Sequence, residues 1–178
     1  MPLSMTGLGV KLTSLIISLS DNNIWPALIL TGIACLLLGM EVPTTAAYVI
    51  CVSVAGPALV DMGLELLQVH LFVFWFALLS TITPPVCGTV FIASGMVSEN
   101  WLKVSLTSMS LGIGLYFIPL GMIANEAIIK LDTDFLSSML AFVKIALSLV
   151  MLSFAFISKN LIIVKMIAFV LGLFVMFI

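Results

Sequence analysis

Two breaks interrupt long apolar stretches of this chain, and each puts prolines and hydroxyl side chains into sequence that is otherwise apolar. The first break reads GMEVPTT (residues 39–45) and the second reads STITPP (residues 80–85). Inside a lipid bilayer an unpaired backbone N–H or C=O group is costly, so a break persists only where another group binds it or packs on it. Two such breaks in one membrane chain indicate a path for a solute or an ion.

The composition places these stretches in a membrane. The chain has 178 residues, of which 63% are hydrophobic and 8% are charged, whereas about 25% of the residues of a soluble domain are charged. Basic residues form no cluster, so binding to nucleic acid has no support. The motifs of ATP-binding loops, zinc hydrolases and serine hydrolases do not occur. We therefore expect an integral membrane protein that is not an enzyme and needs no cofactor beyond a coupling ion.

The apolar runs predict the helices and leave one alternative open. Residues 9–20 form a run that is too short to span a bilayer alone. The runs 25–40 and 44–60 flank the first break, and each lies near the lower limit of about 17 residues for a span. They form either two tilted spans or a re-entrant hairpin. The later apolar runs are 67–98, which contains the second break, 101–124, 135–157 and 161–178.

The lysines predict an orientation. The loops 21–25, 61–66 and 125–134 fall on one side of the membrane in either arrangement, and together they contain a single lysine, Lys130. By the positive-inside rule the other side is cytoplasmic, and a hairpin would enter the membrane from the outside. The four lysines of that cytoplasmic side are Lys11, Lys103, Lys159 and Lys165.

The second break predicts a cluster of uncharged oxygen atoms. Pro84 has no N–H group, so in a helix it frees the carbonyl of Ser80. Pro85 frees the carbonyl of Thr81 in the same way. The hydroxyls of Ser80, Thr81 and Thr83 add further oxygen atoms. Such a group of oxygens at mid-membrane depth suits a hard cation such as Na⁺, and the ends of half-helices add favourable dipoles.

The first break predicts a complementary arrangement. Pro43 frees the carbonyl of Gly39, and Thr44 or Thr45 can begin a helix whose N–H groups face the tip. A helix N-terminus there would suit a carboxylate. Glu41 is the one acidic residue near the tip. It is either a ligand for a proton or a cation, or a solvated loop residue.

Two isolated groups have simpler interpretations. His70 is the only histidine and stands near the start of an apolar run, so we expect it to pack at the membrane interface rather than to bind a metal. Lys144 lies in the middle of the run 135–157. This lysine either pairs with an acidic side chain across a helix contact, which we expect, or extends its ammonium toward the membrane surface.

The two breaks resemble those of the large permease (DctM-like) of TRAP transporters, and in particular the fused permeases that work with TAXI-type binding proteins. The resemblance rests on GMEVPTTAAYVI (residues 39–50) and STITPPVCG (residues 80–88). The runs TGLG (residues 6–9) and HLFVF (residues 70–74) also fit this family. The resemblance covers residues 6–128, and the apolar runs after it are generic.

The resemblance implies an all-α integral membrane fold with a re-entrant helical hairpin, a broken helix and further transmembrane helices. These would form one inverted repeat of an elevator-type ion-transporter fold. Residues 1–24 would end a preceding helix, residues 25–128 would form a transport-domain repeat, and residues 135–178 would be two C-terminal transmembrane helices. Within the repeat, the hairpin would be 25–60, the broken helix 67–98 and a further span 101–124.

The function implied by the resemblance is secondary active uptake. A periplasmic TAXI-type binding protein would hand a small organic acid (a carboxylate) to the permease in a bacterial or archaeal cytoplasmic (inner) membrane. A gradient of Na⁺ or H⁺ would drive its entry. Each motif occurs once, so we expect the chain to be the C-terminal part of a longer permease or a split subunit. It would then need the N-terminal half and the small permease subunit to transport.

A competing interpretation is a non-transporting membrane subunit, or a truncated permease fragment, in which the breaks only shape helix packing. In the transport interpretation, two residues depart from the family pattern: Glu41 stands where glycine is usual, and Thr81 stands where many relatives have asparagine. Na⁺ would lie at Gly39, Ser80, Thr81 and Thr83. The whole predicted site for substrate and cation comprises Gly39, Glu41, Pro43, Thr44, Thr45, Ser80, Thr81, Thr83 and Pro84.

Overall fold

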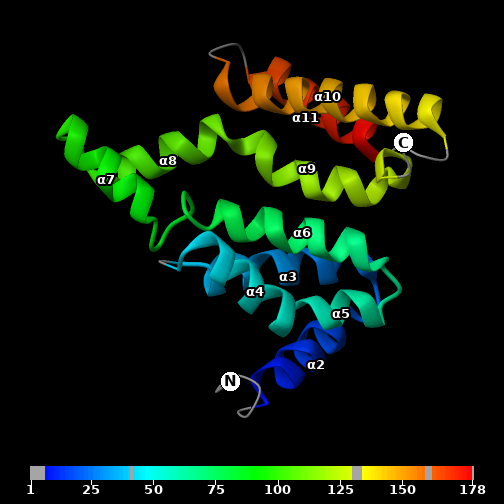
Figure 1. The fold of residues 1–178 in the computed structure, drawn as a ribbon. Coiled ribbons are helices and arrows are strands. Elements are labelled where there is room, and N and C mark those ends of the chain that lie inside the picture. Colours follow the sequence, from blue (N-terminus) through cyan, green and yellow to red (C-terminus); the bar gives the residue numbers. More distant parts are fainter. Residues whose placement is uncertain (1–6, 41, 130–133, 159–161, 178) are drawn as a thin grey trace. The chain divides into compact units, whose positions relative to one another are not determined.

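The computed structural model describes residues 7–40, 42–129, 134–158 and 162–177 (Figure 1). Every regular element in these ranges is a helix, and no strand occurs in them. The expected all-α fold is therefore confirmed for the described residues. The helices form two compact units, residues 1–105 and residues 106–178.

The first unit consists of short apolar helices, and polar side chains cap the starts of two of its core helices. The Asn23 side chain accepts a hydrogen bond from the Trp25 N–H (3.1 Å). Glu65 and Gln68 form a reciprocal capping box at the start of another helix. The helices are α2 (Leu8–Ser20), α3 (Ile24–Leu38), α4 (Thr44–Val54), α5 (Gly56–Asp61), α6 (Leu66–Leu79), α7 (Gly88–Val97) and α8 (Trp101–Leu111), the last of which continues into the second unit.

Small residues let α3 lie directly against its neighbours. A Cβ added to Gly32 would lie 3.0 Å from the ring of Phe76 on α6. The rings of Phe72 and Phe76 contact one another at a tilt of 42°, with their centroids 4.8 Å apart. The Cys51 thiol of α4 donates to the Cys35 carbonyl of α3 (3.6 Å), and both cysteines are fully buried. Close approach through small side chains is how helices associate in lipid, so α3, α4 and α6 form the core of this unit.

The apolar arm 44–60 is two helices rather than the single run that the sequence suggests. α4 and α5 are separated at Ala55. Pro57 lies in the first turn of α5 and has no N–H to donate to the carbonyl of Ser53, so a continuous helix would lack a hydrogen bond at this point. Hydropathy does not detect this break, because the residues on both sides of it are apolar.

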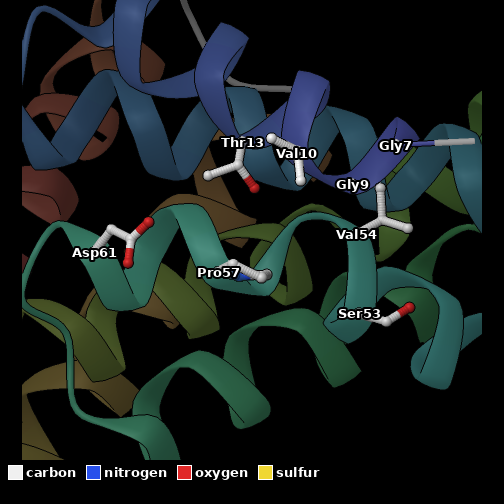
Figure 2. A pocket seen from close by; sticks show the side chains of 8 residues that line it. All are labelled: Gly7, Gly9, Val10, Thr13, Ser53, Val54, Pro57 and Asp61. Carbon is white, nitrogen blue, oxygen red and sulfur yellow. The ribbon is translucent and has the colours of Figure 1, made fainter. Parts of the chain in front are cut away.

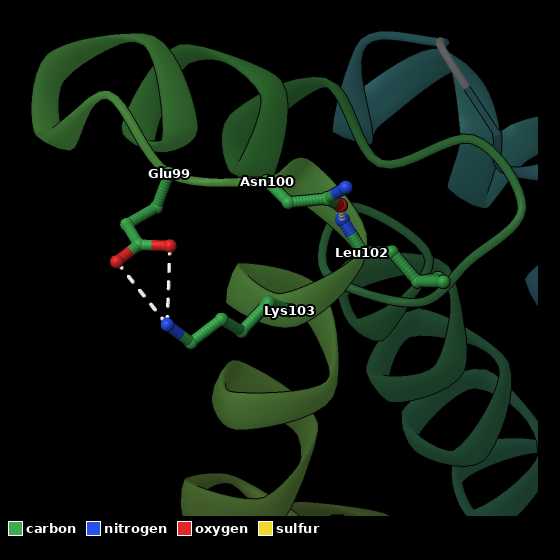
Figure 3. A network of polar contacts seen from close by, with 4 residues as sticks. All are labelled: Glu99, Asn100, Leu102 and Lys103. Carbon is green, nitrogen blue, oxygen red and sulfur yellow. Dashed lines mark hydrogen bonds and ion pairs between the residues drawn. The ribbon is translucent and has the colours of Figure 1, made fainter.

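A polar turn joins α7 to α8 (Figure 3). The Lys103 ammonium lies 3.1 Å from each carboxylate oxygen of Glu99. The Asn100 side chain accepts a hydrogen bond from the Leu102 N–H (2.9 Å) and so caps α8. Because both charged side chains are exposed, this ion pair contributes little stability, about 0–1 kcal/mol.

The second unit is held together by close backbone contacts. A Cβ added to Gly172 would lie 3.1 Å from the Leu152 Cγ, and the Ser148 hydroxyl donates to the Gly172 carbonyl (2.6 Å). The Asn125 amide donates to the Met176 carbonyl (2.8 Å). The elements of this unit are the end of α8, α9 (Ile113–Ala124), the 3₁₀ helix η1 (Glu126–Ile129), α10 (Phe135–Ile157) and α11 (Ile162–Phe177).

Two features of this unit differ from the sequence-based expectation. The run 101–124, expected to be one span, contains two helices with a bend at Gly112. Glycine is less favourable than alanine inside a helix by about 1 kcal/mol, so the helix is weakest at this position. Lys144 is half-buried in α10 and has no ion-pair partner among the described residues. The expected pairing with an acidic side chain is therefore not found in this part of the chain.

Most of the described helices are too short to cross a bilayer as straight spans. α3 has 15 residues and α6 has 14, which corresponds to about 22 Å at 1.5 Å per residue, against a hydrocarbon core of about 30 Å. α10 is the one described helix that is long and apolar enough to cross a membrane by itself. The bent pair α8–α9 adds a second candidate if it forms one span.

Asp134 at the start of α10 gives the second unit a pH-dependent stability. Hydrogen bonds from the Ser137 hydroxyl and N–H lower the pKa of the Asp134 carboxyl below its ordinary value of 3.8. Because the pKa is lower in the folded state, the stabilisation is present above the unfolded pKa and is lost as the pH falls through the folded pKa. We expect the unfolding temperature in detergent to fall more between about pH 5 and pH 3 in the wild type than in Asp134→Asn. Circular dichroism measures the unfolding temperatures. An equal fall in both proteins would contradict this assignment.

Candidate functional site

The two breaks that the sequence singles out lie in contact. Gly39 follows the last residue of α3, and its N–H donates to the Cys35 carbonyl (2.9 Å). Ser80 follows the last residue of α6. Both are buried, and a Cβ added to Gly39 would lie 2.5 Å from the Ser80 Oγ and 3.0 Å from the Ser80 Cβ. Glycine is therefore required at position 39 for the ends of α3 and α6 to meet.

The hydroxyls of the second break each donate a hydrogen bond to a carbonyl of α6. The Ser80 hydroxyl donates to the carbonyl of Ala77 (2.7 Å) and is fully buried. Thr81 and Thr83 do the same with the carbonyls of Leu78 (2.8 Å) and Leu79 (2.7 Å). A hydroxyl that donates its hydrogen to a carbonyl still has lone pairs to offer. A hydroxyl oxygen of this kind can act as a ligand for a cation without giving up its hydrogen bond to the last turn of α6.

The carbonyls of the second break are only partly free. The sequence predicts that Pro85 leaves the Thr81 carbonyl without a donor, but the Thr89 hydroxyl donates to it (2.6 Å). The Ile82 carbonyl accepts from the Ser105 hydroxyl (3.4 Å). The peptide bond between Pro84 and Pro85 is cis. The prediction of an unpaired Thr81 carbonyl is thus wrong, because the chain folds back far enough for Thr89 on α7 to reach it.

The first break begins α4 with an uncapped N-terminus. The carbonyl of Pro43 accepts from the Ala47 N–H (2.9 Å), and no side chain caps this helix among the described residues. Thr44 is half-buried, while Pro43 and Thr45 are exposed. Glu41 lies outside the described residues. The first-turn N–H groups of α4 are therefore available to an acceptor, as an anion site requires.

The start of α4 is directed toward the end of α6. The Tyr48 hydroxyl lies 2.6 Å from the His70 Nδ1, and its ring meets Phe74 edge-on with centroids 5.7 Å apart. Further along, Gly56 faces Val69, which precedes His70 in α6. The two helices are thus antiparallel. The half-buried His70 has a hydrogen-bond partner that the sequence did not reveal, because only the tertiary register brings Tyr48 beside it.

The predicted site has no cluster of acidic, histidine or cysteine ligands. Among the described residues, no three such side chains lie close enough together to hold a metal ion. The oxygens near the contact are the hydroxyls at the end of α6, the carbonyls to which they donate, and the carbonyls at the end of α3. Such a set suits a hard, weakly held monovalent cation better than a tightly bound transition metal.

A crevice of about 430 Å³ lies elsewhere in the first unit, between α2 and the junction of α4 with α5 (Figure 2). Figure 2 shows Thr13 on α2 facing Pro57 and Asp61 on α5 across this crevice. None of the predicted site residues contributes to it. The crevice was not predictable from the apolar pattern, although Pro57 is a signal that the arm is broken there. Its lining residues are Gly7, Gly9, Val10, Thr13, Ser53, Val54, Pro57 and Asp61.

Comparison with known proteins identifies the family of this chain. No curated protein and no solved structure matches the chain. The family described as tripartite ATP-independent periplasmic transporter, DctM component, matches residues 1–134, a range that includes both breaks and all the helices from α2 to α9. Because this match covers more than half of the 178 residues, the chain belongs to the DctM-component family of membrane transporters, which is not a family of enzymes.

Proposed function

We propose that this chain binds a coupling cation, Na⁺ or H⁺, where Gly39 meets Ser80, and takes part in gradient-driven uptake of a small organic acid. The observation that carries the proposal is the convergence of two helix ends. α3 and α6 both finish at this contact. Each helix C-terminus carries about half a negative elementary charge. Two such ends in a low-dielectric environment repel one another unless a cation lies between them.

The substrate side of the proposal rests on α4. Its uncapped N-terminus carries a partial positive charge, and its antiparallel packing directs this end toward the end of α6. A carboxylate held by the first-turn N–H groups of Thr44 and Thr45 would then lie near the cation. Each ion would offset the charge of the other, so binding of one favours binding of the other. This mutual dependence is what couples a gradient to uptake.

The short helices support a re-entrant hairpin. α3 cannot cross the bilayer in a straight line, and α4 and α5 are separated at Ala55. A hairpin whose tip lies at Gly39 would place the tip inside the membrane. The second break, which contacts Gly39 through Ser80, would then lie there too. α6 and α7 would then be the halves of a broken helix. This is the geometry expected of one inverted repeat of an elevator-type transporter.

The family points to an assembly in a bacterial or archaeal inner membrane. A tripartite transporter implies a periplasmic binding protein, for which we propose the TAXI type, and a small permease subunit besides the large permease. We further propose that residues 25–128 supply one of two inverted repeats and need the N-terminal half of a permease for transport. In the alternative, a non-transporting subunit, the same hydroxyls would serve only to end α6.

A cysteine at the hairpin tip distinguishes the two functions. Val42 is half-buried beside Pro43, and the native Cys35, Cys51 and Cys87 are buried and should react slowly. We expect labelling of Val42→Cys by an impermeant maleimide to slow about tenfold or more when Na⁺ replaces choline, because a bound cation would close the tip over the end of α6.

The control is Met96→Cys on α7, where the native side chain is 82% exposed. Labelling at this position should not depend on Na⁺. If protection of Val42→Cys follows pH rather than Na⁺, the coupling ion is H⁺. If labelling of Val42→Cys depends on neither Na⁺ nor pH, the breaks only shape helix packing and the proposed cation site is wrong.

A further inference from the structure

A second groove lies in the C-terminal unit, outside the residues that the family match covers. It has a volume of about 220 Å³ and is formed by the last turn of α10 and the first half of α11. This volume is below the roughly 300–1,000 Å³ of sites for drug-sized ligands. We call it the α10–α11 groove. Its lining residues are Ala155, Phe156, Lys165, Met166, Phe169 and Val170.

The walls of the α10–α11 groove are apolar and face outward. Phe156 and Phe169 meet edge-on with centroids 5.9 Å apart. Met166 is 64% exposed and Val170 is 61% exposed. In a protein that lies in lipid, such side chains contact acyl chains rather than water. A narrow groove between two helices can therefore hold part of one chain.

Among the described residues, Lys165 is the one charged side chain that lines the groove. Its side chain is half-buried, and no carboxylate pairs with it among the described residues. An ammonium beside apolar walls is costly unless an anion or water solvates it. Its long aliphatic stem can follow the groove while the charge reaches the membrane surface. The described lining of the groove therefore combines apolar walls with the positive charge of Lys165.

The position of the groove along the helices matches the depth of a lipid headgroup. α10 ends at Ile157 and α11 begins at Ile162, so the groove lies within about two turns of the helix ends. The lysine distribution predicts that this end is cytoplasmic, the side on which anionic lipids give the membrane surface a negative potential.

We propose that the α10–α11 groove binds an anionic phospholipid, with one acyl chain against Phe156 and Phe169 and the phosphate beside Lys165. The charge pattern selects this occupant, because a zwitterionic lipid would bring a second positive charge to the same place. The proposal depends on the membrane location of the chain and not on the cation site in the first unit. Its failure would leave the proposed transport function unaffected.

Native mass spectrometry of the full chain in detergent tests the proposal, with phosphatidylglycerol and phosphatidylcholine as the two lipids. We expect phosphatidylglycerol to be retained in preference to phosphatidylcholine. Lys165→Ala should lower phosphatidylglycerol retention about fivefold, the factor that one lysine near the surface supplies. Lys165→Arg should keep the preference. Lys103→Ala is the matched control, because Lys103 is exposed and pairs with Glu99.

A second pair of variants tests the apolar part of the site. Val170→Trp would fill the groove and should lower retention of both lipids, whereas Ile167→Trp, at a residue that is 54% exposed but does not line the groove, should not. Retention in Lys165→Ala equal to that of the wild type would overturn the proposal. Equal retention in the two tryptophan variants would also overturn it. Displacement of the lipid by inorganic phosphate alone would show an anion site rather than a lipid site.

Discussion

Gly39→Ala is expected to lower the free energy of unfolding by about 1–3 kcal/mol, the usual effect of overpacking, and to abolish Na⁺-dependent protection at position 42. A Cβ there would lie 2.5 Å from the Ser80 Oγ and 3.1 Å from the Cys35 carbonyl oxygen. The helix ends must then separate, because rotation of the Ser80 hydroxyl would still leave its Cβ 3.0 Å from the added methyl group. Thermal unfolding in detergent and maleimide labelling of Gly39→Ala in the Val42→Cys background measure the two effects.

Two further variants make this result specific. Gly95→Ala on α7 adds the same methyl group where no atom lies within 4 Å. It should leave labelling unchanged and the free energy of unfolding the same or slightly higher, because alanine is favoured over glycine inside a helix. Ser80→Gly removes the side chain that Gly39→Ala would strike. In that background Gly39→Ala should therefore lower the free energy of unfolding much less. A double-mutant cycle reports this difference as a coupling energy between the two positions. Equal stability of Gly39→Ala and Gly95→Ala would contradict the contact.

Thr83→Val is expected to raise the Na⁺ concentration needed for half-protection of Val42→Cys by about tenfold or more. Thr83 is only 9% exposed, and its hydroxyl donates to the Leu79 carbonyl. Valine has a similar shape and lacks the oxygen, so a cation would lose one ligand worth roughly 1.5–3 kcal/mol. Folding should change little, because the Leu79 carbonyl still accepts from the Ile82 N–H (3.2 Å). A Na⁺ titration of labelling measures the shift.

Three further threonine variants serve as controls for the effect of Thr83→Val on Na⁺-dependent labelling. Thr83→Ser keeps the oxygen and should keep most of the Na⁺ affinity. Thr13→Val removes a hydroxyl from the crevice beside α2 and should have no effect. Thr45→Val lies at the start of α4 and should impair substrate-coupled uptake in a complete complex while membrane insertion is unchanged. If Thr13→Val raised the Na⁺ concentration for half-protection and Thr83→Val did not, the cation would be assigned to that crevice rather than to the end of α6.

The helix pattern was largely predictable from the sequence. The run 135–157 and the helix α10 have the same bounds, the second break (80–85) is non-helical, and so are the described residues 39, 40, 42 and 43 of the first. Prolines and polar residues act locally, through a missing N–H or a capping side chain, so their effect can be anticipated from neighbours in the chain. The divisions at Ala55 and Gly112 were not anticipated. Both lie within uninterrupted apolar runs, where hydropathy carries no signal.

The partners of the site residues could not be predicted. The hydrogen bonds from Thr89 to Thr81 and between Tyr48 and His70 join separate helices. Such pairings depend on how far one helix slides and turns against the next. One sequence contains no record of that register.

By itself, the sequence determined the apolar composition typical of a membrane protein, the two breaks and the residue types placed in them. Each of these follows from local covalent chemistry and from the lengths of the apolar runs. Only the tertiary structure decided that Gly39 lies against Ser80 and that two helix C-termini converge there. The physical reason is that the convergence depends on close packing between helices. A buried glycine allows it, but a glycine in the sequence does not show which side chain will fill the space.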